Sequence, residues 1–202
     1  RNSGYLFSGN ALSAILNVLQ GILVARLIGD VGLGLLTIIM DFASNINRLL
    51  SFRMSEVVVK FAGAALSQGN KERAAAIIKG IGIAEALTSI VAYLVLLMLS
   101  AWGAQVFVKD LSVIYLFQFY GLFLLANLVY ETSVGILQTT DKFKRVASAN
   151  FYQSIVLTAL IVVAVVWNMG ILGVLTAYLV SKTVASLLIL IAALRALKDD
   201  LG

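Results

Sequence analysis

The stretch LGLLTIIMDFASNINRLLSFRMSEVVVK, residues Leu33 to Lys60, decides the fold, because it is apolar enough to enter a membrane yet carries charged side chains. Its polar residues recur at intervals of three and four, a spacing that places them on one stripe of a helix. The stripe consists of Thr37, Asp41, Ser44, Arg48, Ser51 and Ser55. A charge near a bilayer centre costs at least about 2.5–3.5 kcal/mol. We therefore expect the stripe to face protein or water, and not lipid.

The charges on this stripe have two interpretations. Asp41 and Arg48 lie two helical turns apart, too far for a simple pair between positions i and i+4, so each would need a partner on a neighbouring helix. The stripe would then have a purely structural role. We favour the other interpretation, a stripe that lines a polar cavity, because embedded charges usually mark functional pathways.

The composition indicates a helical integral membrane protein. Of the 202 residues, 61% are apolar and 12% are charged, whereas soluble domains have about 45–50% and about 25%. The apolar segments lack the alternation of membrane β-strands. The net charge of +5 is expected to come from basic loops on the cytoplasmic side of a membrane, so we expect no nucleic-acid partner.

The missing residue types exclude several kinds of chemistry. The chain contains no histidine and no cysteine, which removes disulfides, thiol nucleophiles, histidine acid–base catalysis and most transition-metal sites. It also has no GK[ST] phosphate loop, no HExxH and no nucleophile elbow. We therefore predict that the protein is not an enzyme and has no catalytic residues, no metal site and no cofactor.

Six apolar segments are long enough to cross a bilayer, at about 20 residues each. The predicted spans are residues 5–27, 33–58, 74–100, 112–138, 146–167 and 171–194, in a single domain over residues 1–202. The first span carries a polar line made of Asn10, Ser13, Asn17 and Gln20. This line either bonds to a neighbouring helix, for about 0.6 kcal/mol per contact, or forms a wetted face. We favour a wetted face that shares one space with the stripe around Arg48, because the turn joining the two spans is short.

Ionisable groups also lie in the later spans. Glu85 is in the third span, and Glu131 is in the fourth, beside Asn127. Lys182 lies deep in the sixth span, where a lysine needs either a carboxylate partner or a cavity. The carboxylates available to it are Asp41, Glu85 and Glu131.

The basic residues predict the orientation in the membrane. If the N-terminus is cytoplasmic, nearly all of the 15 lysines and arginines fall in cytoplasmic segments. Only Arg26 and Lys109 then lie in outer connections, and only Arg48 and Lys182 are embedded. We therefore expect both termini to be cytoplasmic, because lysine and arginine are enriched in cytoplasmic loops.

Three segments carry a resemblance to a known family. ARLIGDVGLGLLTI (Ala25 to Ile38) looks like the family's first hairpin. FRMSEVVVKFAGAALSQGNKERAAAIIK (Phe52 to Lys79) resembles its connection between helices two and three and is the most specific of the three. GILQTTDKFKR (Gly135 to Arg145) resembles its connection between helices four and five. Together they are similar to the N-terminal half of the Wzx-type oligosaccharide flippases of polysaccharide biosynthesis. These belong to the superfamily of the lipid II flippases and the multidrug and toxic compound extrusion transporters.

The resemblance implies a two-lobe architecture. Such transporters usually have twelve to fourteen helices in two lobes of six, with the cavity between the lobes. This chain would supply one six-helix lobe, and its partner would be a second lobe from a missing C-terminal half or from another chain. The start at Arg1, without a methionine, favours a fragment over a half-size protein.

The resemblance also implies a mechanism, in which alternating access moves a lipid-linked oligosaccharide, carried on a polyprenyl pyrophosphate, across the prokaryotic cytoplasmic membrane. The lipid tail would stay among the membrane lipids. The implied anion contacts are Arg26, Arg48, Arg53 and Lys182. The implied polar groups of the cavity are Asn10, Asn17, Gln20, Asn45 and Asn127. The implied groups for ion coupling or charge balance are Asp41, Glu85 and Glu131.

Two other functions remain open. An ion-coupled multidrug antiporter of the same superfamily would need a cavity dominated by carboxylates, whereas here basic groups accompany the embedded acids. A non-transporting membrane subunit would use its polar stripes only to hold helices together. Transport by the reconstituted complete chain separates this last function from the first two.

Overall fold

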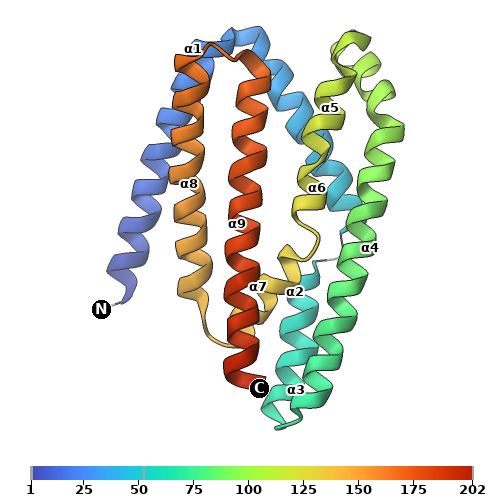
Figure 1. The fold of residues 1–202 in the computed structure, drawn as a ribbon, viewed down its shortest axis with the longest axis vertical. Helices are drawn as coiled ribbons and strands as arrows, with labels where there is room; N and C mark the ends of the chain where they lie inside the picture. The colour runs from blue at the N-terminus through green and yellow to red at the C-terminus, as the bar shows by residue number, and fades with distance from the viewer. Residues whose placement is uncertain (1, 52, 202) are drawn as a thin grey trace.

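The computed structural model describes the backbone of residues 2–51 and 53–201 and the side chains of residues 16, 18–51 and 53–199. Within these residues the chain is helical and has no strand, as the composition predicted (Figure 1). In chain order the elements are α1 (Asn2–Leu50), α2 (Met54–Val57), η1 (Val58–Ala62), α3 (Gly63–Ser67), α4 (Lys71–Gly103), η2 (Ala104–Val108), η3 (Leu111–Val113), α5 (Ile114–Gly121), α6 (Phe123–Ala126), α7 (Tyr130–Thr139), α8 (Phe143–Val166) and α9 (Gly170–Leu201). Of these, η1 and η2 are π-helical and η3 is a 3-10 helix.

Five helical runs in the described chain are long and apolar enough to cross a membrane, as expected of a multi-pass membrane protein. They are Val18–Ser67, Lys71–Val108, Leu111–Thr139, Phe143–Val166 and Gly170–Asp199. The sequence predicted six spans. The difference lies in the first run, whose 50 residues are more than twice the number, about 20, that one span needs.

Gly29 divides this first run into two limbs. Its φ of 66° and ψ of −178° are not helical, and glycine adopts a positive φ without the clash that a Cβ causes. Figure 1 shows α1 running to one end of the bundle, bending there, and returning toward the middle. This bend falls between the first two predicted spans, 5–27 and 33–58.

The connections alternate between two ends of the bundle (Figure 1). One end, which we call the Gly29 end, also holds the links from α4 to α5 and from α8 to α9. The opposite end, which we call the Ser67 end, holds the C-terminus and the links from α3 to α4 and from α7 to α8. Exposed basic side chains gather in these two links and just after them, among them Lys71, Arg73 and Arg145.

The buried apolar side chains form two clusters stacked along the bundle. The cluster toward the Gly29 end, which we call the aromatic core, contains the rings of Phe117, Tyr120 and Phe123. The cluster toward the Ser67 end, which we call the aliphatic core, consists of Val58, Ala62, Ile78, Ile136, Leu137, Ala149, Ile189, Ala193 and Ala196. The functional candidates concentrate at the level where these two cores meet.

Candidate functional site

Two of the predicted spans are broken at the level between the two cores. In the span predicted over 33–58, α1 ends at Leu50 and α2 begins at Met54. In the span predicted over 112–138, α6 ends at Ala126 and α7 begins at Tyr130. Both breaks lie near mid-height in Figure 1. Unwound backbone at membrane depth occurs only where protein buries it or where it lines a water-filled cavity, so the breaks mark a candidate site.

A buried carboxylate from α4 closes the second break. The Oε1 of Glu85 accepts the backbone N–H of Glu131 at 2.8 Å, and its Oε2 accepts the backbone N–H of Thr132 at 2.8 Å. Helices begin with N–H groups that have no partner in the helix, and a negative charge is favourable there. Glu85 is only 4% exposed, so these two bonds also satisfy a carboxylate that has little access to water.

The start of α7 is in turn bonded to the start of α2. The Oγ of Ser55 donates to the Oε2 of Glu131 at 2.5 Å. One turn further along α7, the two backbones come close together: a Cβ built on Gly135 would lie 2.9 Å from the carbonyl oxygen of Ser55 and 2.7 Å from the Cβ of Val58. The two broken helices therefore restart side by side, in contact through a hydrogen bond and through a glycine.

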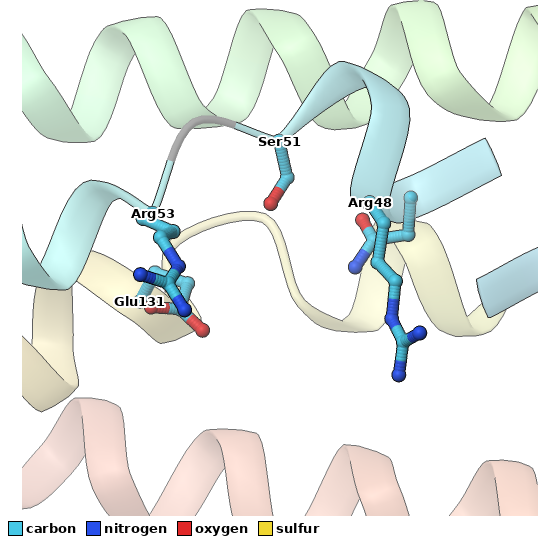
Figure 2. Close-up of a pocket in the computed structure, with 5 residues that line it drawn as sticks. Arg48, Ser51, Arg53 and Glu131 are labelled. Carbon is cyan, nitrogen blue, oxygen red and sulfur yellow. The ribbon is translucent and has the colours of Figure 1, made fainter. Parts of the chain in front are cut away.

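A cleft of about 790 Å³ opens at the first break. Its lining is Asn47, Arg48, Ser51, Arg53 and Glu131 (Figure 2). Figure 2 shows the two arginines on either side of Ser51, with the Arg48 side chain extending away from its helix and Arg53 beside Glu131. Two guanidinium groups thus share one polar cleft with a single carboxylate.

The cations of the cleft are weakly neutralised. Arg53 pairs with Glu56 at 2.9 Å, but the two side chains are 83% and 66% exposed, and water screens such pairs strongly. Within the described residues Arg48 has no ion-pair partner. The structure therefore does not show the pairing of Arg48 with Asp41, Glu85 or Glu131 that a purely structural role would need.

Arg53 also has a strained backbone, with a φ of 29° and a ψ of 52° just before α2. The left-handed region costs a residue with a Cβ roughly 1–2 kcal/mol. The other described non-glycine residues with positive φ are Lys109, Asp141 and Asn168, and these lie in links at the bundle ends. Backbone strain of this kind clusters at functional sites, where the surroundings impose it.

The stripe predicted on the second span is exposed in part: Thr37, Asp41 and Arg48 are exposed, whereas Ser44, Ser51 and Ser55 are half-buried. Asp41, Asn45 and Arg48 are all exposed, whereas Ile39 and Ala43 on the other side of the helix are buried. Ser55, at the end of the stripe, bonds to Glu131 of α7, whereas no described helix covers Asp41 or Arg48. Arg26 is exposed as well, but it lies near the Gly29 end and does not line the cleft.

The polar line of the first span is only partly described. The side chains of Asn10 and Asn17 lie outside the described residues, so the space that they face stays a prediction. Gln20 is 3% exposed, and its Nε2 donates to the Oγ1 of Thr158 at 2.8 Å and to the carbonyl of Ser154 at 3.2 Å. This side chain therefore joins α1 to α8, which is the interhelical interpretation, and it does not line the cleft.

Lys182 has an aromatic partner that the sequence did not predict. Its Nζ lies 4.5 Å from the centroid of the Phe123 ring, a cation–π contact between α9 and α6. No carboxylate lies within ion-pair distance of it among the described residues. Asn127 is half-buried in the second break, where its carbonyl accepts the Tyr130 N–H at 3.1 Å.

The structure brings together three of the predicted site residues, Arg48, Arg53 and Glu131. It adds Asn47, which lies off the predicted stripe and beside Arg48 in sequence. The two breaks could not be recognised from the sequence, because the chain contains no proline and neither break is marked by a glycine.

One comparison with known proteins gives a match. A family model described as "Polysaccharide biosynthesis protein" matches residues 1–199, which include both breaks and the cleft. No curated protein and no solved structure matches the chain.

Proposed function

The chain belongs to the polysaccharide biosynthesis protein family, and from this premise we propose that it flips a lipid-linked oligosaccharide, carried on a polyprenyl pyrophosphate, across the cytoplasmic membrane by alternating access. The family and the five long apolar runs support a membrane transporter. The cleft supports the choice of substrate.

The observation that carries this proposal is the pair of guanidinium groups, on Arg48 and Arg53, in one cleft between the two cores. A guanidinium presents a planar fork of donors that suits a phosphate group. The amide of Asn47 and the hydroxyl of Ser51 add groups that suit sugar hydroxyls. Half-helices that meet near the bilayer midplane are a recurrent way of building transporter sites.

The exposed part of the stripe supports a second lobe as the partner. Asp41 and Arg48 would each carry a cost of at least about 2.5–3.5 kcal/mol if this face of α1 were in contact with lipid. We therefore place a second six-helix lobe opposite the stripe, with the cleft between the lobes. In this arrangement the two limbs of α1 count as separate spans, which gives six, and the basic Ser67 end faces the cytoplasm.

The lining of the cleft favours this proposal over a multidrug antiporter. A site for cationic drugs needs an excess of carboxylates, whereas this cleft has two arginines and one glutamate. The single carboxylate, Glu131, already accepts a hydrogen bond from Ser55. The local charge favours an anionic ligand.

Substitution of Arg48 in the complete transporter tests the proposal. Arg48→Gln removes one charged contact to phosphate, which is worth about 1.5–3 kcal/mol, so transport at limiting substrate should fall roughly 10- to 100-fold. Arg48→Lys keeps the charge without the fork and should retain partial activity. Glycan export in cells would be measured beside the thermal stability of the purified protein. Arg195→Gln, which removes an exposed guanidinium near the end of α9, is the matched control and should export normally.

A purely structural role for Arg48 predicts a different result. In that case Arg48→Gln would leave Asp41 uncompensated and lower the melting temperature. Neutralising Asp41 as well would then restore both stability and export. A double variant that transports normally would rule out the substrate contact.

A further inference from the structure

Glu85 is the only charged side chain that is buried among those the structure describes, and it does not line the cleft. Both of its oxygens are occupied by backbone N–H groups of the first turn of α7. A transported anion therefore does not meet this carboxylate directly. Its effect on the cleft has to pass through α7.

The path from Glu85 to the cleft consists of three short contacts. Glu85 accepts the backbone N–H of Glu131, and the side chain of Glu131 both lines the cleft and accepts the hydroxyl of Ser55 at 2.5 Å. Ser55 lies in the first turn of α2, directly after the break. In the same turn the N–H of Glu56 donates to the carbonyl of Arg53 at 3.0 Å, which ties the strained residue to the helix.

Close packing makes α2 follow any movement of α7. The absence of a side chain at Gly135 lets α7 lie against the carbonyl of Ser55 and the side chain of Val58. Val58, the first residue of η1 after α2, and Ile136 of α7 are both buried in the aliphatic core. A shift at the start of α7 is therefore transmitted to the start of α2.

We propose that Glu85 is a positioning residue: through the first turn of α7 and the Glu131–Ser55 bond it holds the break that presents Arg53 to the cleft. Without it, two N–H groups in the bundle interior would lose their partners, and the first turn of α7 would unwind toward other acceptors. Glu131 would then move away from Ser55, and Arg53 would leave its left-handed conformation. The identity of the ligand rests on the proposed function, whereas the positioning role does not.

The test uses the absence of native cysteine. Ser51→Cys places the chain's only thiol in the cleft, and its rate of reaction with a small water-soluble maleimide in membranes reports the geometry of the break. Glu85→Gln keeps one side-chain oxygen that can accept a backbone N–H and replaces the other oxygen with an amide nitrogen, which cannot accept one. We expect it to change the labelling rate at position 51 at least fivefold. Gln118→Ala, which removes a 3.2 Å hydrogen bond between α5 and Ser100 of α4, is the matched control and should leave the rate unchanged.

Ser55→Ala provides a second variant that leaves the buried carboxylate in place, for the case that Glu85→Gln does not fold. It removes the Glu131–Ser55 hydrogen bond, the second of the three contacts, and should shift the labelling of the thiol at position 51 in the same direction. An unchanged rate in Ser55→Ala, or an equal change in Gln118→Ala, would overturn the positioning role. A lowered melting temperature of Glu85→Gln with unchanged labelling would also overturn it, because a merely structural residue gives that result.

Inorganic pyrophosphate separates this inference from the proposed function. It should protect the thiol at position 51 from labelling in the chain that carries only Ser51→Cys, and protection should weaken when Glu85→Gln is added. If pyrophosphate gives no protection in any variant while the Glu85 and Ser55 substitutions still change the labelling rate, the anion site fails and the positioning role stands.

Discussion

The aromatic core and the aliphatic core differ in how their side chains interlock. In the aromatic core Phe42 meets Phe117 edge-on with ring centroids 5.3 Å apart, and Tyr120 stacks on Phe123 at 5.2 Å. Such rings fix their neighbours in one arrangement. The buried members of the aliphatic core are valine, isoleucine, leucine and alanine, and one of its helix contacts is made by the backbone at Gly135. The contrast predicts a rigid half toward the Gly29 end and a more deformable half toward the Ser67 end.

The helices divide between the two halves in a way that fits this contrast. α4 and α9 run without a break through both cores, whereas α1 continues as α2, and α6 as α7, only after an interruption. The pieces α2 and α7 pack in the aliphatic half and are attached to each other by the Ser55–Glu131 bond. We expect any opening of the cleft to move these two pieces together against the unbroken helices.

The largest effect is expected in the labelling of the two ends of the bundle by a thiol reagent. With an impermeant thiol reagent added outside intact cells, Val31→Cys at the Gly29 end should label fully and Gln68→Cys at the Ser67 end should not. Both positions are exposed, so access to the reagent and not burial decides the outcome. The physical reason is the excess of lysine and arginine at the Ser67 end, because such residues are enriched on the cytoplasmic side of membranes. Ready labelling at position 68 would reverse the orientation.

The second effect is the loss of stability caused by the same leucine truncation in each of the two cores. Leu116 of the aromatic core and Leu137 of the aliphatic core are 1% and 0% exposed, so Leu→Ala removes the same buried group in both. Such changes cost about 2–5 kcal/mol, depending on how far the surroundings can close the cavity. We expect Leu116→Ala near the upper value and Leu137→Ala near the lower one, measured as unfolding free energies in detergent. Equal losses would mean that the aliphatic half is packed as rigidly as the aromatic half.

The smallest effect is expected when single glycines of the two cores are replaced by alanine. A Cβ at Gly135 meets backbone at 2.9 Å, whereas a Cβ at Gly121 meets a flexible end of the Leu96 side chain at 2.5 Å. Gly135→Ala should therefore lower stability by about 1–3 kcal/mol and reduce export, because α2 must move off α7. Gly121→Ala should cost less and leave export unchanged. Gly82→Ala is the control, since its Cβ would have an ordinary contact of 3.7 Å. Normal export in Gly135→Ala would separate the α2–α7 contact from function.

The sequence predicted the helical class and the family because these depend on local composition and on contiguous motifs. The apolar runs and the turn at Gly29 belong to this group. The breaks do not, because their stabilising partners are remote: Glu85 lies 46 and 47 positions from the N–H groups that it accepts. Helical spacing alone extends a span straight through such an interruption.

The candidate site was predictable in part for the same reason. Arg48 and Arg53 were identified from their own charge in an apolar segment, and the structure places both in one cleft. The same pattern also selected Gln20, which instead bonds to Thr158 across a helix contact. A polar residue on a membrane helix can line a cavity or bond to a neighbouring helix, and the position of that neighbouring helix decides which of the two occurs.

The contact between Lys182 and Phe123 has a consequence for how easily an embedded charge can change partners. Separating a buried ion pair strands an anion in a medium of low dielectric constant, at a cost of about 3–5 kcal/mol. A benzene ring carries no net charge, and a cation leaves its face for about 0.5–2 kcal/mol. The Phe123 ring can therefore release the Lys182 ammonium without leaving an unpaired negative charge inside the bundle.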